Sequence, residues 1–386
     1  MDSIYLDAAA TAKYTNVDDI IVDTMVTAMR DSWMNPSSLY ATNVRSKIDK
    51  CRKNIADFIN AKPEEIVFTS GASESNNMAI RGWVDNMLVS QSNMIHVITT
   101  PIEHKSILKA IENDALGAIV HYCDVDRHGF VDYKSLERLL NRYKNNPILV
   151  SIGTANNEIG TIQDLAKISK LVHEYGGILH VDSTQALGHI PIDVEELGVD
   201  MLSASGHKIS PVLRGVGFLY KRNGVNIKPL IYGAQEQGLR GGTENTCGII
   251  GLSKALEYCD FSYEVMSEMR DKRDFFISQL ESKFGCKLNG HRRCRLLNNI
   301  NVSFPKNIYG ESLLYVLDMS GIKVSTSSAC NSKSIEPSYV LTSIGLTKEE
   351  AIRSVRFSLP NDITYDEINK VISEIDKAIK ILEMEN

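Results

Sequence analysis

Short apolar runs alternate with helix-period segments from residue 17 to residue 220. The runs are rich in β-branched residues and predict seven strands, at residues 66–68, 95–98, 119–122, 148–152, 178–181, 201–204 and 217–220. Residues 165–175 repeat apolar side chains at helical spacing, which predicts an amphipathic helix with one face on the core. Repeated units of this kind favour an α/β fold in which a seven-stranded, mostly parallel sheet lies between helices.

The pattern changes towards the C-terminus. A glycine-rich turn at residues 238–242 leads into a helical stretch that continues to about residue 284, and shorter strands and helices follow up to a charged terminal helix. This change predicts two domains. We expect a large domain at residues 15–255, and a smaller α+β domain made of residues 1–14 together with residues 256–386.

Composition restricts the class of protein. The 386 residues are 43% hydrophobic and 23% charged with a net charge of −6, which indicates a globular protein without a basic face for nucleic acid. No apolar run reaches membrane-spanning length, and the first residues lack the features of a secretory signal, so we expect a cytoplasmic protein. The seven cysteines form no C-x-x-C pair, which argues against a disulfide framework and a zinc site and is typical of a reducing compartment.

Two charged residues follow neighbouring strands of the predicted sheet. Asp182 ends the strand at 178–181, and Lys208 comes just after the strand at 201–204. The carboxyl ends of parallel strands open onto one crevice, so this carboxylate and this amine can face a single bound ring. The pair suits pyridoxal phosphate, with Lys208 as the Schiff-base lysine and Asp182 on the pyridine nitrogen. The competing interpretation is an ordinary ion pair between loops.

Other polar residues occupy the same predicted edge. Residues 69–76, which include Ala72 and Ser73, join the first strand to a helix, and a helix N-terminus with small residues attracts phosphate. The alternative for Ser73 is a helix cap. His104 follows the second strand and could lie against the ring, although a loop histidine is usually solvated. Asn156 follows the fourth strand, where it could bond the phenolic oxygen of the cofactor or form a turn.

A cysteine and an arginine near the C-terminus carry the remaining candidate chemistry. Cys330 lies among hydroxyl residues in a loop-like segment, whereas the other six cysteines have apolar or helix-like neighbours. This setting predicts an exposed thiol that can act as a nucleophile. Arg356 lies inside a strand-like alternation, where it either pairs structurally or binds a substrate carboxylate.

In this order, the motifs resemble the cysteine desulfurases of the class V aminotransferase group, which have fold type I of the pyridoxal-phosphate enzymes. The resemblance covers nearly the whole chain and rests on residues 5–7, 68–71, 103–105, 156–160, 180–182, 205–208, 328–330 and 336–339. The long segment around Cys330 is similar to the subgroup in which the catalytic cysteine is on a long loop. One departure follows Lys208, where the chain is one residue longer than the family pattern and lacks its Gly-Pro-Lys turn.

The resemblance implies a role for each candidate. Lys208 would carry pyridoxal 5'-phosphate, Asp182 would bind its ring nitrogen and His104 would stack on the ring. Gln185 and Asn156 would contact the phenolic oxygen. The phosphate would be bound by Ala72, Ser73, Ser205 and His207, and by Thr243 from a second subunit. Arg356 and Asn156 would contact the substrate, and Cys330 would accept the sulfur.

The implied reaction converts L-cysteine to alanine and leaves a persulfide on Cys330, for delivery to a sulfur-acceptor protein. The resemblance also implies a homodimer and no direct contact with nucleic acid or membrane. Selenocysteine lyase is the serious alternative, because the two substrates differ by one chalcogen atom. An aminotransferase would leave Cys330 without a role, and a non-catalytic relative would lack the lysine that this chain retains at position 208.

Overall fold

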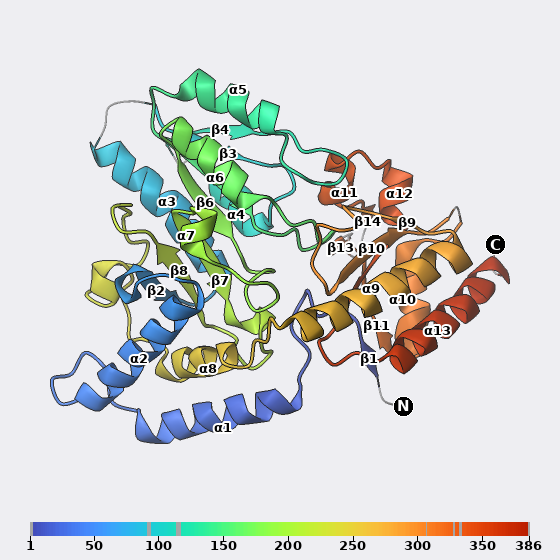
Figure 1. The fold of residues 1–386 in the computed structure, drawn as a ribbon, viewed down its shortest axis with the longest axis horizontal. Helices are drawn as coiled ribbons and strands as arrows, with labels where there is room; N and C mark the ends of the chain where they lie inside the picture. Colours follow the sequence, from blue (N-terminus) through green and yellow to red (C-terminus); the bar gives the residue numbers. More distant parts are fainter. Residues whose placement is uncertain are drawn as a thin grey trace.

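The computed structural model describes residues 3–90, 94–112, 117–305, 307–326, 329–331 and 334–384, with the backbone alone for residues 90, 329–331, 334 and 335. Two bodies of secondary structure lie side by side, a larger one around a long sheet and a smaller one around a short sheet (Figure 1). In the described part of the chain, no helix has both the length and the apolar character needed to cross a membrane.

The larger sheet has seven strands in the order β2-β8-β7-β6-β5-β3-β4. They are β2 (Ile66–Thr69), β3 (His96–Thr99), β4 (Ile119–Tyr122), β5 (Ile148–Gly153), β6 (Ile178–Asp182), β7 (Met201–Ser205) and β8 (Gly217–Lys221). Each predicted run is therefore a strand, and the prediction of a mostly parallel sheet is confirmed. Only β8 departs from the parallel arrangement, since it is antiparallel to both of its neighbours, β2 and β7.

Helices cover both faces of this sheet. Side chains alternate between the faces along each strand, so Val150 and Leu149 of β5 belong to different apolar clusters. The helices that contribute to the cluster of Val150 are α1 (Asn16–Asp31), α2 (Thr42–Phe58), α5 (Tyr133–Tyr143), α6 (Leu165–Glu174), α7 (Val194–Leu197) and α8 (Thr246–Leu256). Those on the side of Leu149 are α3 (Ala72–Ser90) and α4 (Lys105–Ile111).

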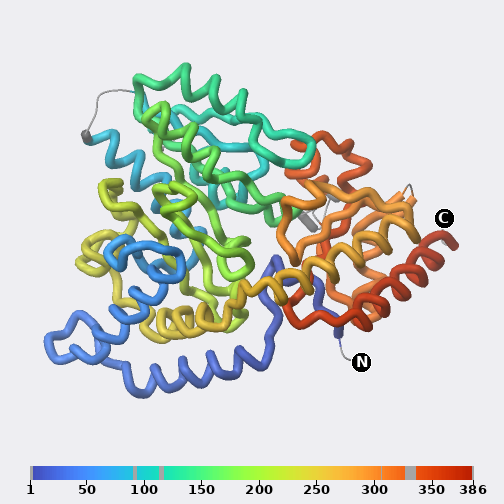
Figure 2. The backbone as a smooth tube through the Cα atoms, in the orientation of Figure 1, coloured from blue at the N-terminus to red at the C-terminus, as the bar shows by residue number. Residues whose placement is uncertain are grey.

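The smaller body is an antiparallel sheet in the order β12-β15-β10-β9, made of β9 (Lys287–Leu288), β10 (Asn299–Ser303), β12 (Ser325–Thr326) and β15 (Ser354–Ser358). The helices α9 (Tyr263–Phe284), α10 (Gly310–Met319) and α13 (Tyr365–Met384) share an apolar cluster with it. The N-terminal strand β1 (Ile4–Tyr5) pairs with β11 (Ile322–Lys323), so the first residues lie among the C-terminal ones (Figure 2). The domain limits 15–255, 1–14 and 256–386 stay a prediction.

One predicted element is wrong. The stretch from residue 242 to about residue 284 is two helices, because α8 ends at Leu256 and α9 begins only at Tyr263. In the connection, the side chain of Asp260 accepts a hydrogen bond from the Ser262 amide at 2.8 Å. Phe261 of the same connection packs on Phe58 of α2. The helical spacing of apolar residues continues across the break between α8 and α9, so the sequence pattern does not reveal it. The local turn and the tertiary contact produce this break.

A hairpin and two short helices lie between β12 and β15. The hairpin consists of β13 (Ala329–Asn331) and β14 (Ser334–Glu336), and the helices are α11 (Tyr339–Ser343) and α12 (Lys348–Ile352). Val340 and Leu341 of α11, and Ile344 just after it, share an apolar cluster with Ile102 and Ile159, which follow β3 and β5. The smaller body therefore packs directly on the loops at the carboxyl ends of the parallel strands.

Candidate active site

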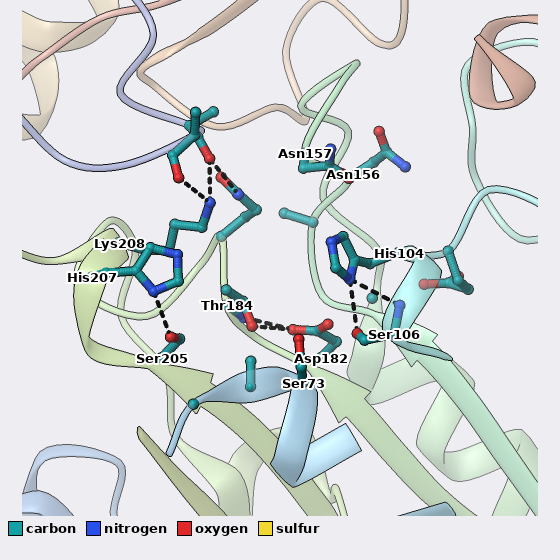
Figure 3. A pocket seen from close by; sticks show the side chains of 18 of the residues that line it. Ser73, His104, Ser106, Asn156, Asn157, Asp182, Thr184, Ser205, His207 and Lys208 are labelled. Atoms are coloured by element: carbon teal, nitrogen blue, oxygen red, sulfur yellow. Dashed lines mark hydrogen bonds between the residues drawn. The ribbon is translucent and has the colours of Figure 1, made fainter. Parts of the chain in front are cut away.

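A cavity of about 700 Å³ opens where the parallel strands end, between the two bodies (Figure 3). Ten of the twelve predicted site residues line it. They are Ala72, Ser73, His104, Asn156, Asp182, Gln185, Ser205, His207, Lys208 and Arg356. These residues come from segments that are distant in the sequence, and the sheet topology brings them together.

Asp182 is the last residue of β6 and is buried. Its Oδ2 accepts a hydrogen bond of 2.7 Å from Nδ2 of Asn76 on α3, and its Oδ1 accepts one of 2.9 Å from the amide of Thr184 and another from the Thr184 hydroxyl. These hydrogen bonds fix the orientation of the carboxyl group. Asp182 is therefore held as a rigid acceptor for a positively charged group in the cavity.

Lys208 lies in the short 3₁₀ turn Gly206–Lys208 that follows β7, and its side chain extends into the cavity. Its Nζ donates to the carbonyl oxygens of Ala9 and Ala10 at 2.6 and 2.7 Å. Burial, and next the nearby charge of Arg356, lower the pKa of Lys208 to about 8. A substantial neutral fraction near pH 8 makes this amine a nucleophile and a base.

The N-terminus of α3 forms one end of the cavity, with Ser73 in its first turn. Free N–H groups in the first turn of a helix attract anions. The Oγ of Ser205 is 2.8 Å from Nδ1 of His207, whose pKa is lowered to about 4, first by burial and next by Lys208. Glu74 would repel an anion here, but Arg240 pairs with it at 2.8 Å. The arrangement fits a phosphate group.

His104 is at the N-cap of α4 and faces the cavity. Its Nδ1 accepts a hydrogen bond of 3.1 Å from the Ser106 amide, so in the neutral ring the proton is on Nε2. Although the residue is exposed towards the cavity, protein atoms replace much of the water around its ring, and this loss of solvation lowers its pKa. A neutral ring at this place can lie against a planar ligand.

Both predicted contacts to the phenolic oxygen have protein partners. Asn156 donates to the Ile102 carbonyl at 2.9 Å and accepts from the amides of Glu158 and Ile159 at 2.9 and 3.1 Å. The Asn156 side chain therefore forms a turn, as the competing interpretation of this residue proposed. One of its two amide hydrogens remains available for a ligand. Gln185 donates to the Ala9 carbonyl at 3.0 Å and retains its oxygen as an acceptor. Their contacts to a cofactor stay predictions.

Arg356 is in the middle of β15 and is 8% exposed. Its Nη2 pairs with Asp7 at 2.6 Å, and its Nη1 donates to the Asn157 carbonyl at 3.0 Å. The buried Nε has no hydrogen-bond partner among the described residues. The structural pairing therefore exists, and it leaves donors of the guanidinium for a carboxylate in the cavity.

Two predicted site residues are not placed in this cavity. Thr243 is exposed and lines a neighbouring cavity of about 160 Å³. The backbone of Cys330 belongs to β13, but its side chain lies outside the described residues. The roles of Thr243 and Cys330 stay predictions.

The sequence reasoning missed several partners of the site residues. Asn76 lies one helical turn after Ser73 in the segment proposed for phosphate, so helical spacing could have indicated it. Asp7, Ala9 and Arg214 reach the site only through the tertiary fold. In the sequence, Glu103 is simply the neighbour of His104, yet it is buried and its burial raises its pKa to about 8.

A parallel-stranded α/β fold with a lysine and a buried carboxylate at the strand ends defines an enzyme class that binds a ring-shaped phosphorylated cofactor. The chain belongs to the aminotransferase class-V family, whose model it matches over residues 4–371. This family assignment is consistent with the enzyme class that the site defines. This family and the relatives below imply the use of pyridoxal phosphate.

Two curated relatives match almost the full chain. A cysteine desulfurase IscS of Dictyoglomus turgidum is 42% identical over 98% of this chain and 95% of its own, and one of Methanosarcina thermophila is 41% identical over 98% and 93%. Among solved structures, a NifS-like protein superposes with a TM-score of 0.88 at 32% identity, covering 98% of this chain and 100% of its own. SspA in complex with cysteine has a TM-score of 0.79 at 33% identity, over 93% and 99%.

Proposed function

We propose that this protein is a pyridoxal-phosphate-dependent cysteine desulfurase. The observation that carries the proposal is the meeting of Lys208, Asp182 and Arg356 in one cavity, because these provide an amine, an acceptor for a ring cation and a carboxylate-binding guanidinium. The names of the relatives, cysteine desulfurase and SspA in complex with cysteine, support L-cysteine as the substrate.

The residues present fit the cofactor. Lys208 would hold it covalently, the Asp182 carboxylate would face its ring nitrogen, and Ser73, Ser205 and His207 would surround its phosphate at the N-terminus of α3. The Asp182 carboxylate already has its other partners in Asn76 and Thr184, so a protonated nitrogen can complete its shell without rearrangement. When bound, the cofactor would supply an electron-accepting ring that stabilises a carbanion at the substrate α-carbon.

The protein groups then move protons and bind the substrate. Lys208, with its pKa lowered to about 8, could take the α-proton of the substrate on Nζ. The carbonyl oxygens of Ala9 and Ala10 accept hydrogen bonds from the resulting ammonium. Arg356 binds the substrate carboxylate through its remaining N–H donors, while Asp7 and the Asn157 carbonyl keep its guanidinium plane fixed.

The sulfur would move to Cys330. The Cys330 thiolate attacks the sulfur of L-cysteine, a sulfur–sulfur bond forms and the carbon–sulfur bond breaks. The electron pair of the broken bond stays on carbon, which takes up a proton, so that L-cysteine and one thiol become alanine and one persulfide. A sulfur-acceptor protein would then remove the outer sulfur.

The assembly would be a homodimer in which Thr243 reaches the phosphate site of the partner subunit. In support, Thr243 is exposed, and it follows the glycine-rich stretch 238–242 next to the cavity that it lines. A cytoplasmic location belongs to the same proposal, in keeping with the reducing conditions that a free catalytic thiol requires.

Substitution of Cys330 tests the sulfur step. After incubation with L-cysteine, mass mapping of the wild type should show one additional sulfur on Cys330, with an equal amount of alanine in solution. Cys330→Ala should keep the change in visible absorption that L-cysteine produces but form almost no alanine. Alanine at the wild-type rate without Cys330 would defeat the mechanism. Selenocysteine is assayed in parallel, and turnover of selenocysteine alone would favour the lyase alternative.

A further inference from the structure

The segment that carries Cys330 is anchored on both sides by described residues. On the N-terminal side, β12 pairs with β15, and Ser325 lies opposite Arg356 in the register. On the C-terminal side, Ser338 and Tyr339 follow β14 after Pro337 and form hydrogen bonds to the large body. The hairpin β13–β14 lies between these anchors, with Cys330 opposite Ile335.

The C-terminal anchor consists of two hydrogen bonds. The hydroxyl of Ser338, which is 3% exposed, donates to Oε2 of Glu158 at 2.5 Å. The hydroxyl of Tyr339 donates to the backbone carbonyl of Glu103 at 2.7 Å, and burial raises the pKa of this tyrosine, so it stays a donor. Tyr339 also packs at the edge of the apolar cluster formed by α11 with Ile102 and Ile159.

The two acceptors belong to segments that form the cavity. Glu103 precedes His104, and Glu158 lies in the turn that the Asn156 side chain organises. Pro337 has a fixed φ, so restraint of Ser338 and Tyr339 also restrains the end of β14. The same hydrogen bonds therefore relate the position of the hairpin to the position of the cavity.

We propose that Ser338 and Tyr339 are positioning residues for sulfur transfer, which fix the hairpin of Cys330 relative to the cavity through Glu158 and Glu103. This inference rests on the proposed function. Neither residue lines the cavity, so they act on the approach of the thiol to the substrate sulfur and leave substrate binding and α-proton removal unchanged.

The test compares two reaction phases in Tyr339→Phe, Ser338→Ala and the double variant. After mixing with L-cysteine, the change in visible absorption should keep its wild-type rate. The appearance of the additional sulfur on Cys330 should slow about fivefold in each single variant, the factor expected for one lost hydrogen bond. The double variant should be slower by about 25-fold if the two bonds act independently.

A second readout needs no turnover. Hydrogen exchange of the amides in β13 and β14 should be faster in the variants, because the hairpin samples more positions. Ser338→Thr keeps the hydroxyl, both as the donor to Glu158 and as the cap of α11, and should restore both rates. Tyr175→Phe is the matched control, since its hydroxyl bonds Glu137 on α5.

Three outcomes would overturn the inference. They are wild-type sulfur transfer in the double variant, equal slowing of both phases, and unchanged hydrogen exchange of the hairpin. Failure of the proposed function gives a different result, because desulfuration would then persist in Cys330→Ala whatever the Ser338 and Tyr339 variants do.

Discussion

Replacement of Arg356 by lysine isolates the part of the site that would recognise the substrate carboxylate. The guanidinium has five N–H donors, of which one on Nη2 serves Asp7 and one on Nη1 serves the Asn157 carbonyl. Nε is buried, and the remaining hydrogens of the two Nη atoms can act as a two-pronged donor for a carboxylate in the cavity that Arg356 lines. Lysine keeps the charge but provides only one of these prongs.

The size of the effect follows from the lost hydrogen bond. A hydrogen bond to a charged group contributes about 1.5–3 kcal/mol, so kcat/KM for L-cysteine should fall roughly 10- to 100-fold in Arg356→Lys. The loss should be mainly in KM, because the carboxylate is bound before and during the reaction. The visible absorption of the bound cofactor should remain, since Lys208 and Asp182 are unchanged.

Steady-state alanine production over a range of L-cysteine concentrations measures this split. Arg353→Lys is the matched control, because Arg353 lies on the same segment but bonds the carbonyls of Glu349 and Phe304 away from the cavity. Thermal unfolding of both variants checks that folding is intact. A KM for Arg356→Lys within about twofold of the wild type would refute the assignment of Arg356 as the carboxylate-binding residue.

Three further predictions concern the cofactor, the pH dependence of stability and the assembly. Lys208→Ala should lose the visible absorption of the cofactor and its fixation by borohydride, and a variant that keeps both would show that another group holds the cofactor. Burial raises the pKa of Glu103 from 4.5 to about 8, so the folded state keeps a proton on this carboxyl group at pH values where the unfolded state has lost it. The contribution of the protonated Glu103 to the free energy of unfolding therefore decreases above pH 4.5 and is lost as the pH rises through 8. Between about pH 5 and pH 9, the Tm of the wild type should therefore fall relative to that of Glu103→Gln, and parallel curves would contradict the raised pKa. The protein should sediment as a dimer, and Thr243→Val should lose cofactor faster on dialysis; a monomer saturated with cofactor would rule out the shared site.

The strands, and the position of several candidate residues at the cavity, could be predicted from the sequence because their signals are local. Each apolar run of the large sheet needs only a few consecutive residues to be recognised, and Asp182 and Lys208 are informative because they come at strand ends. The motifs around His104 and Ser73 are likewise contiguous, and the resemblance added a role for each of them. The alternation of strands and helices then restricted the fold to a parallel α/β arrangement.

Tertiary structure decided the contacts between distant segments. Asp7 and Arg356 are 349 residues apart, and no periodic pattern relates them. The same is true of Ser338 with Glu158, and of Lys208 with the carbonyls of Ala9 and Ala10. The antiparallel direction of β8 and the turn-forming role of Asn156 also depend on neighbours in space. Sequence periodicity reports which face of an element is apolar, whereas the partner of a buried polar group depends on how the elements pack.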